Sequence, residues 1–251
     1  MTDATPYGEL RVNYDGETLE MSDMAPAPLT QFQRWFADVL EEGLPEPNAM
    51  VVATASLDGT PSARHVLLKQ ADERGFVFYT NYESRKGREL TANPHASLVF
   101  PWFAMYRQVT VVGRVQRVSR EESAGYFATR PHGSRIGALA SHQSSELEDR
   151  AVLEQRWREL AEQYPDDVPL PDSWGGFLVI PETIEFWAGR RSRLHDRLQY
   201  VHVGGRVELG IHDRSHRPHP RVHVLWRHRY GVVQGCTCAH NHRWDQISAL
   251  A

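Results

Sequence analysis

A series of short apolar and β-branched runs between residues 48 and 119 constrains the fold more than any other feature of the chain. Turn signals separate the runs, among them Asp58–Gly59 and the stretch from Asp72 to Gly75. Strands that follow one another through short turns pair in antiparallel fashion, and several of them can close into a barrel. The runs are AMVVATAS, SARHVLLKQ, FVFYTN, HASLVFPWF and YRQVTVVGRVQRVS. We therefore expect a mainly β fold with peripheral helices, closed or nearly closed as a barrel.

Three segments have the apolar spacing of surface helices. The first covers residues 29–40, and its Thr30 and Gln33 resemble a capping box. The second covers 119–131 and the third 145–164. After the third helix, GFLVIPETIEFWAG and RLHDRLQYV predict two further strands that return to the barrel.

Charge and composition divide the chain into three parts. Residues 1–25 form a polar N-terminal arm, residues 26–205 hold the predicted barrel domain, and residues 206–251 form a basic, His-rich tail that contains both cysteines. Two cysteines are too few to staple a secreted fold, and the N-terminus lacks a signal-peptide pattern, so we expect a cytoplasmic protein. No apolar run is long enough to span a membrane, so we expect no membrane partner.

Clustered cations at strand ends form a first candidate anion site. Arg64 opens one predicted strand and Lys69 closes it, while Arg85 and Lys86 stand together after a turn. Arginine and lysine beside serine and backbone donors suit a phosphate, which needs charge and several hydrogen-bond donors. The plainer interpretation is that these cations are solvated strand ends.

A second candidate anion site lies around the predicted 119–131 helix. Tyr126 and Arg130 are four residues apart and share a helix face, and Ser134 follows just past the end of this helix. Such pairs are also common on helix surfaces. Gln143 and Ser144 precede the next helix, where side-chain donors suit an anion but capping is an equally simple role.

The RLHDR segment carries the strongest local signal. Arg193, His195 and Arg197 alternate along a predicted strand, which would put them on one face, with Leu194 and Asp196 on the other. Three cationic or titratable groups in a row repel one another unless an anionic or polar ligand lies there. Trp187, just upstream, could supply a flat apolar wall.

Several mechanisms have no support in the sequence. There is no GxGxxG before a helix, no GxxxxGK[ST] and no HExxH, so a dinucleotide fold, a P-loop and a zincin are not indicated. Both cysteines lie outside the barrel section, which argues against thiol catalysis there. We expect no metal in the active site and no nucleic-acid partner.

Taken together, these motifs make the chain resemble the pyridoxamine (pyridoxine) 5'-phosphate oxidases over about residues 10–200. The matching stretches follow family order: PNAMVVATAS, RHVLLK, GFVFYTNYESRKGREL, LVFPW, RQVTVVG, YFATRPHGSRIGALASHQSS, PLPDSWGGF and IEFWAGRRSRLHDR. The resemblance implies an FMN-binding split β-barrel and a homodimer with two active sites at the subunit interface. It also implies oxidation of pyridoxamine or pyridoxine 5'-phosphate to pyridoxal 5'-phosphate, with O2 reduced to H2O2.

The resemblance also implies roles for individual residues. Those matched to FMN contacts are Arg64, His65, Val66, Leu67, Leu68, Lys69, Tyr79, Thr80, Arg85, Lys86, Gln108, Gln143, Ser144, Trp187 and Arg197. Those matched to substrate contacts are Arg11, Tyr14, Lys69, Tyr126, Arg130, Ser134, Arg193, Leu194 and His195. Arg193 and His195 would lie over the pyridine ring as the catalytic pair, and Arg11 and Tyr14 would help to close the site. Gln143, Ser144, Trp187 and Arg197 would come from the partner subunit.

The resemblance ends after Tyr200, and the tail leaves several hypotheses open. Arg, His, Trp and Cys follow in no clear period, as in a reading-frame change in a high-GC gene, which predicts disorder after about residue 212. A lineage-specific extension and a basic nucleic-acid-binding tail are alternatives. A metal site is another, and its ligands would be Cys236, Cys238, His240 and His242.

If the tail removes the last strand of the barrel, the chain would be a flavin- or pyridoxal-phosphate-binding protein without turnover. A split-barrel reductase that uses a nicotinamide or deazaflavin donor is a further alternative. The matches at Tyr126, Arg130, Ser134 and RLHDR disfavour it.

Overall fold

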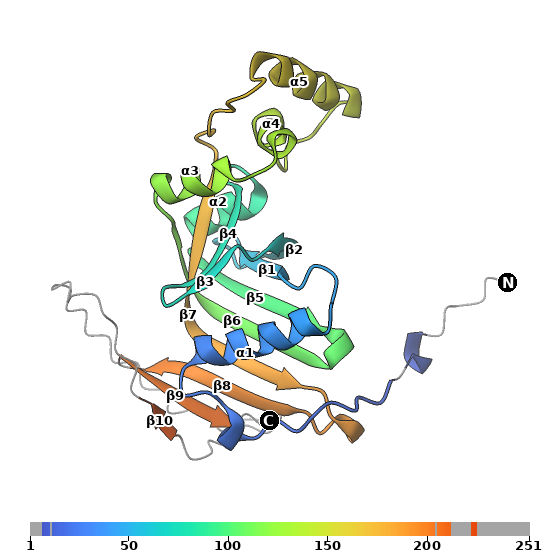
Figure 1. Ribbon diagram of the computed structural model, residues 1–251, viewed down its shortest axis with the longest axis vertical. Helices are drawn as coiled ribbons and strands as arrows, with labels where there is room; N and C mark the ends of the chain where they lie inside the picture. The colour runs from blue at the N-terminus through green and yellow to red at the C-terminus, as the bar shows by residue number, and fades with distance from the viewer. Residues whose placement is uncertain (1–6, 11, 204, 212–221, 225–251) are drawn as a thin grey trace, which may run out of the picture.

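One large antiparallel sheet organises the chain in the computed structural model, which describes residues 7–10, 12–203, 205–211 and 222–224 (Figure 1). Its strands run in the order β10-β9-β8-β7-β6-β5-β1-β2, while β4 pairs with β7 and β3 pairs with β4. The strands are β1 Ala49–Ala55, β2 Pro61–Leu67, β3 Gln70–Asp72, β4 Gly75–Asn81, β5 His95–Trp102, β6 Arg107–Arg117, β7 Trp174–Ala188, β8 Asp196–Val203, β9 Arg206–Ile211 and β10 Val222–Val224.

The 15-residue strand β7 joins the two halves of the sheet. Its first part pairs with β4, its last part pairs with β8, and β6 runs alongside both. The register between β6 and β7 shifts at Val112/Gly113, opposite Pro181. Gly113 is required there, because a Cβ would lie 1.9 Å from the carbonyl oxygen of Ile180. A bulge bends a sheet, and here the sheet curls into an open half-barrel.

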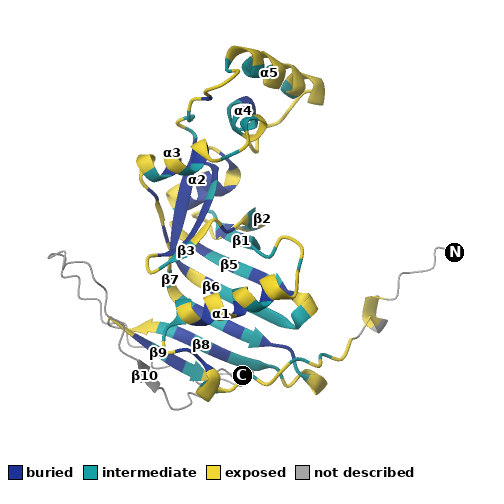
Figure 2. Cartoon of the chain, viewed as in Figure 1, coloured by how far each residue is buried: buried dark blue, intermediate teal, exposed yellow. Residues whose placement is uncertain are grey.

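Helix α1 (Pro28–Glu41) closes the concave side of this sheet (Figures 1 and 2). Phe32 contacts Phe76 and Phe100 edge to face at centroid distances of 4.9 and 5.0 Å, and Trp35 contacts Phe186 at 5.1 Å. All of these rings are buried. The apolar residues whose spacing predicted this helix therefore form the face that packs into the barrel. Its predicted capping box is wrong, because α1 begins two residues before Thr30 with Pro28 in its first turn.

The other helices lie at one end of the sheet, on the links between β4 and β5 and between β6 and β7 (Figure 1). Ser119 caps α3 as its sequence suggests, its Oγ accepting the Glu122 N–H at 2.9 Å. The helix after Pro131 was not predicted from the sequence, and the third predicted helix begins at Arg150 instead of residue 145. The helices are α2 Arg85–Ala92, α3 Arg120–Ala128, α4 His132–Ala140 and α5 Arg150–Gln163, and the short 3-10 turns are η1 Tyr7–Glu9, η2 Met21–Asp23, η3 Phe103–Met105 and η4 Arg191–Arg193.

The sheet continues past residue 205, where the sequence placed the start of the tail. Strand β9 pairs with β8 along its whole length, and β10 pairs with β9. Val207 and Leu209 of β9 are buried in the main core. The predicted disorder after residue 212 is wrong for Val222–Val224, which form β10. The rest of that segment, with the candidate metal ligands from Cys236 to His242, lies outside the described residues.

The described part of the chain contains neither a membrane-spanning helix nor a metal-binding group of side chains. None of its helices combines the length and the apolar character needed to cross a bilayer. Nor do three or more His, Cys, Asp or Glu side chains gather there in a way that could hold a metal ion.

Candidate functional site

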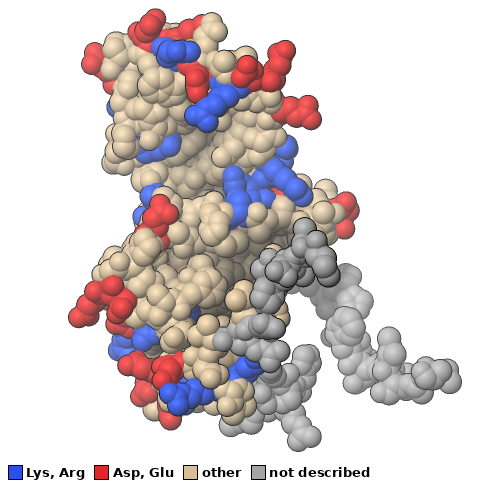
Figure 3. Space-filling view, turned by 90° about the vertical axis from the view of Figure 1, so that its right-hand side faces the viewer, with Lys and Arg blue, Asp and Glu red and all other residues tan. Residues whose placement is uncertain are grey.

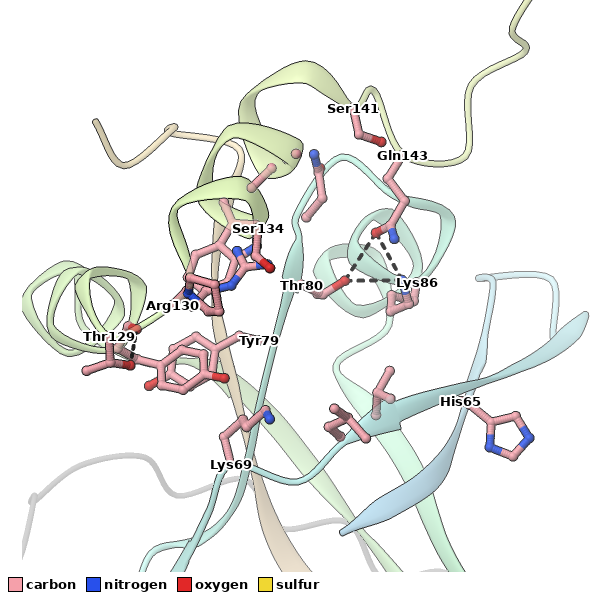
Figure 4. A pocket seen from close by; sticks show the side chains of 18 residues that line it. His65, Lys69, Tyr79, Thr80, Lys86, Thr129, Arg130, Ser134, Ser141 and Gln143 are labelled. Carbon is pink, nitrogen blue, oxygen red and sulfur yellow. Dashed lines mark hydrogen bonds between the residues drawn. The ribbon is translucent and has the colours of Figure 1, made fainter. Parts of the chain in front are cut away.

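A cavity of about 670 Å³ opens between the sheet and the helical end of the molecule (Figure 4). On the face to the right of Figure 1, Lys and Arg side chains gather beside a hollow at this level (Figure 3). The lining includes most of the sequence-predicted residues of both candidate anion sites: His65, Val66, Leu67, Lys69, Tyr79, Thr80, Lys86, Tyr126, Arg130, Ser134 and Gln143. It also includes Asn81, Thr129, Pro131, Gly137, Ala138, Ser141 and Trp174, which the sequence interpretation did not assign to the site.

Lys86 is the centre of one side of the cavity. It lies in the first turn of α2, and its Nζ donates to Thr80 Oγ1 at 3.1 Å, to Ser84 Oγ at 3.3 Å and to Gln143 Oε1 at 3.2 Å. Only 7% of this lysine is exposed. Burial, together with the nearby charge of Arg64, lowers the pKa of Lys86 to about 8. A buried cation at a helix N-terminus is a strong anion-binding feature.

Arg64 and Arg85 extend this side into a neighbouring hollow that also reaches Lys86 and Ser144. We call Arg64, Arg85 and Lys86 the cationic cradle. Arg64 comes from β2, whereas Arg85 and Lys86 begin α2. The first candidate anion site is therefore a real cluster of three cations, brought together by pairing β2 with β1 and by the turn that starts α2.

Arg130 is the centre of the opposite side of the cavity, with Ser134 beside it (Figure 4). Its guanidinium carbon lies 4.7 Å from the centre of the Trp174 ring, and its Nη1 is buried without a hydrogen-bond partner among the described residues. Burial lowers the pKa of Arg130. Buried donors are normally satisfied, so this atom indicates a place for an anionic ligand. We call Tyr126, Arg130 and Ser134 the Arg130 clamp.

Stacked aromatic rings form the floor beneath the clamp. Tyr79 stacks on Tyr126 at 4.1 Å and on Trp174 at 5.4 Å. Burial raises the pKa of Tyr79 to about 12, so its hydroxyl stays protonated at neutral pH. Lys69 Nζ lies 6.0 Å from the centre of the Tyr126 ring. The cavity thus offers cations on two sides of a flat apolar floor.

Gln143 lines the cavity of its own chain, and the expected contact with the partner subunit's site stays a prediction. Its Oε1 accepts bonds from Thr80 Oγ1 and from Lys86 Nζ. Ser144 lines the neighbouring hollow of the cradle. Leu68, matched to an FMN contact, is instead packed in the main core and lines neither space. Gln143 takes its position because the loop after α4 reaches the start of α2, where Lys86 lies.

A second group of expected site residues lies outside this cavity. Gln108, Trp187 and Arg197 are direct cross-strand neighbours on β6, β7 and β8, so they share one face of the sheet. Arg197 Nη1 donates to Glu185 Oε1 at 2.8 Å on the same face. Sequence spacing could not have shown this row, because it depends on the register of three strands.

Arg193 and His195 belong to the loop of residues 189–195, and the predicted alternation along a strand is wrong. Strand β8 begins only at Asp196, and Ser192 and Arg193 have positive φ values of 57° and 60°. Leu194 is 77% exposed. Left-handed backbone at two successive non-glycine residues breaks any period-two pattern, so Arg193, His195 and Arg197 do not share a strand face.

His195 packs between two aromatic rings, 4.7 Å from Trp187 and 5.4 Å from Tyr14. The backbone N–H of Arg190 donates to His195 Nδ1 at 2.9 Å. An N–H group can only donate, so Nδ1 is the acceptor of this bond.

The N-terminal segment holds this loop from outside. Asp15 accepts from Arg191 Nε at 2.9 Å and from Nη2 at 2.6 Å, and the Gly16 N–H donates to the carbonyl of Gly189 at 3.2 Å. These bonds bring Tyr14 beside His195, and its role in closing the site stays a prediction. Arg11 lies outside the described residues.

Two family models match the chain. The model described as pyridoxamine 5'-phosphate oxidase matches residues 36–164, and the model described as the pyridoxine 5'-phosphate oxidase C-terminal dimerisation region matches residues 174–229. The chain belongs to the pyridoxamine 5'-phosphate oxidase family. The match runs past Tyr200, where the sequence interpretation ended it, and includes β9 and β10.

Curated relatives agree with this assignment. A pyridoxine/pyridoxamine 5'-phosphate oxidase from Burkholderia multivorans is 57% identical over 197 residues, which are 78% of this chain and 92% of that relative. One from Paraburkholderia phymatum is 58% identical, over 78% of this chain and 93% of that relative.

Solved structures share the fold. PhzG from Burkholderia lata 383, in complex with tetrahydrophenazine-1-carboxylic acid, has a TM-score of 0.75 and 32% identity, over 80% of this chain and 98% of that one. A related FMN-binding protein from Nostoc punctiforme has a TM-score of 0.61 at 15% identity, over 76% of this chain and all of that one. The expected split barrel and the FMN cofactor are confirmed at the level of the family, and the dimerisation region supports a homodimer.

The residues present fit an FMN phosphate. Three cations, Ser144 and the start of α2 meet on the cradle side of the cavity. Such a set supplies both the charge and the donors that a phosphate dianion needs. The aromatic floor and the second cationic side leave room for a planar substrate with an anionic group of its own.

Proposed function

We propose that this chain oxidises pyridoxamine 5'-phosphate and pyridoxine 5'-phosphate to pyridoxal 5'-phosphate, using FMN and O2 and releasing H2O2. The observation that carries the proposal is that Lys86 of the cradle and the Arg130 clamp line one cavity, while Arg64 and Arg85 line a neighbouring hollow that shares Lys86 with it. The reaction involves two phosphates, one on FMN and one on the substrate. The unpartnered, buried Nη1 of Arg130 supports a phosphorylated substrate on the clamp side.

FMN, when bound, would supply the redox chemistry, which is hydride acceptance from the substrate carbon that bears the amine or alcohol and electron transfer to O2. For the amine, the net reaction also consumes water and releases ammonia. The chain itself binds and orients. The cradle holds the cofactor phosphate, the clamp holds the substrate phosphate, and the stacked floor excludes water from one side of the cavity.

The second group of residues completes the site from the partner subunit in this proposal. Gln108, Trp187 and Arg197 face away from the core on the sheet, and Trp187 and Arg197 belong to the part of the chain that the dimerisation model matches. Arg193 would orient the substrate ring and stabilise negative charge that develops on it. His195, held by the Arg190 N–H and packed on Trp187, would assist Arg193 beside the substrate ring.

Turnover of purified protein tests the proposal. With FMN, pyridoxine 5'-phosphate should give a product that absorbs as the aldehyde, together with an equal amount of H2O2. Pyridoxine without its phosphate should react far more slowly, because it leaves Arg130 unpaired. Flavin binding without turnover of either phosphorylated substrate would indicate a binding protein instead. Oxidation of a tricyclic carboxylate in preference to the phosphorylated substrates would indicate a PhzG-like activity. A cytoplasmic location stays a prediction.

A further inference from the structure

Glu89 is a buried carboxylate behind the cationic cradle, and none of the roles assigned so far uses it. It lies one turn after Arg85 on α2, and 8% of its side chain is exposed. Its Oε1 accepts from Arg85 Nε at 2.8 Å, and its Oε2 accepts from Ser62 Oγ at 2.5 Å and from Thr54 Oγ1. Arg64 Nη2 lies 3.4 Å from the same Oε2.

This carboxylate connects two cations that come from different elements. Arg64 lies on β2 and also donates from Nη1 to Thr54 Oγ1 at 2.6 Å and from Nη2 to Ser62 Oγ. The hydroxyls that receive these bonds are the ones that donate to Glu89. Both Nη groups of Arg85 have no hydrogen bond to any described residue and remain available beside the hollow. The network therefore fixes each guanidinium while it leaves donors for a ligand.

Glu89 stays ionised at every pH at which the protein would work. Burial alone would raise the pKa of Glu89, but hydrogen bonds from Ser62, Thr54 and Arg85 lower it to about 2. The fixed negative charge also reduces repulsion among Arg64, Arg85 and Lys86 when no anion is bound. Charge-assisted, multiply bonded carboxylates of this kind hold arginines in a defined orientation.

We propose that Glu89 is a positioning residue that holds Arg64 and Arg85 in the arrangement that binds the FMN phosphate, without itself touching the cofactor. This inference rests on the FMN site of the proposed function. A carboxylate at this position could also have the opposite effect on phosphate binding. A buried anion so close to a phosphate could simply repel it, and its removal would then tighten binding.

Paired titrations with FMN and riboflavin distinguish these roles. Riboflavin lacks the phosphate, so a change in cradle geometry alters the affinity for FMN alone. For Glu89→Gln, we expect the Kd for FMN to rise by roughly 10- to 100-fold, because two charge-assisted contacts are weakened. The Kd for riboflavin should stay within about twofold of the wild-type value. Quenching of flavin fluorescence by the apoprotein reports both constants without any turnover.

Glu154→Gln is the matched control. Arg150 and Glu154 on α5 form the same i,i+4 pair, with Arg150 Nε donating to Glu154 Oε1 at 2.7 Å, but on the surface and away from the cavity. This variant should bind both flavins as the wild type does. Arg85→Lys gives a second, milder test, because it keeps the charge of the cradle but loses the Nε contact with Glu89. It should weaken FMN binding and spare riboflavin.

Unchanged or tighter FMN binding by Glu89→Gln would overturn the proposal, as would an equal loss of affinity for FMN and riboflavin. If Glu89→Gln does not fold, the Arg85→Lys result decides, and an unchanged FMN-to-riboflavin preference there would overturn the proposal. Arg64→Ala tests the site itself. If wild-type protein shows no preference for FMN over riboflavin, or Arg64→Ala keeps that preference, the assigned FMN site is wrong whatever Glu89 does.

Discussion

The cationic cradle holds its arginines in a buried network on regular elements, whereas the loop of residues 189–195 holds its arginines on exposed, irregular backbone. In the cradle, Arg64 starts from a strand, Arg85 starts from a helix, and a buried carboxylate lies between them. In the loop, Arg193 follows another residue with positive φ, and the links to the N-terminal segment are solvent-exposed. Left-handed non-glycine residues persist only where the surroundings enforce them.

This contrast indicates a division of labour between a preformed binding region and an adjustable reacting region. The cradle makes its hydrogen bonds within the protein before any ligand arrives, so little ordering remains when the phosphate binds. The loop depends on a segment nearly 180 residues earlier in the chain, through bonds such as the one from the Leu19 N–H to Asp196. Substitutions in the cradle should therefore change the Kd for FMN, whereas substitutions that disturb the loop should change kcat/KM.

The largest expected effect tests the rigidity of the cradle. In Gly87→Ala, the new Cβ would lie 2.1 Å from the carbonyl oxygen of Tyr82 and 2.5 Å from its carbonyl carbon, and backbone atoms cannot rotate away as the end of a flexible side chain can. We expect the free energy of unfolding to fall by about 3 kcal/mol, as for other overpacked sites, together with loss of FMN binding. Denaturant titration measures the first and flavin fluorescence the second. Gly125→Ala on α3, where nothing lies within 4 Å, should instead leave stability equal or slightly higher.

Arg130→Ala should affect the substrate and spare the cofactor. Loss of a charge-assisted contact to phosphate is expected to lower kcat/KM for pyridoxine 5'-phosphate by about 100-fold. Steady-state H2O2 release measures this. The Kd for FMN should not change, because Arg130 does not line the hollow that holds Arg64 and Arg85. A parallel loss of FMN affinity would show that the two sides of the cavity are not independent.

The pH dependence of FMN binding should report the buried lysine of the cradle. With its pKa lowered to about 8, Lys86 is charged below pH 8 and loses its proton above it. The FMN phosphate is a dianion over this range, so affinity should be level below pH 8 and fall above, by about tenfold between pH 7 and pH 9. Lys86→Arg stays charged, so its affinity should be level up to pH 9. A wild-type profile without this fall would contradict the assignment.

The smallest expected effect concerns the exposed link of the loop. Asp15→Asn removes the ion pair with Arg191, and we expect kcat/KM to fall by about two- to fivefold with no change in the Kd for FMN. Because salt screens exposed pairs, wild type should approach the variant as ionic strength rises. Steady-state kinetics at two salt concentrations measures both effects. A change in the Kd for FMN would show that the loop also affects cofactor binding, which would contradict the contrast between the loop and the cradle.

Much of the barrel and of the cradle could be predicted from the sequence, because both depend on local pattern. The Asp58–Gly59 turn places Gly59 at φ 85°, and the strands on either side pair as expected. Arg85 and Lys86 follow a capping serine, Ser84, which fixes where α2 begins and therefore where their side chains point.

The remaining features depend on contacts between distant residues. The alternation of Arg193 and His195 imitates a strand, but Asp15 and other residues far away in the sequence determine the shape of that loop. Glu89 looks like an ordinary charged helix residue until Arg64 is placed beside it by strand pairing. Such roles become visible only when the register of the sheet is known.

The length of strand β7 sets the distance between the two groups of site residues. Trp174 at its start lies under the Arg130 clamp, and Trp187 near its end packs on His195. At about 3.4 Å per residue, an extended strand of that length separates the two rings by roughly 40 Å, too far for one ligand to touch both in one chain. If each site combines the start of one β7 with the end of another, two inactive variants, one lacking Arg130 and one lacking Arg193, should regain part of their activity when their subunits are mixed. A hybrid dimer would then contain one intact site and one site with both defects.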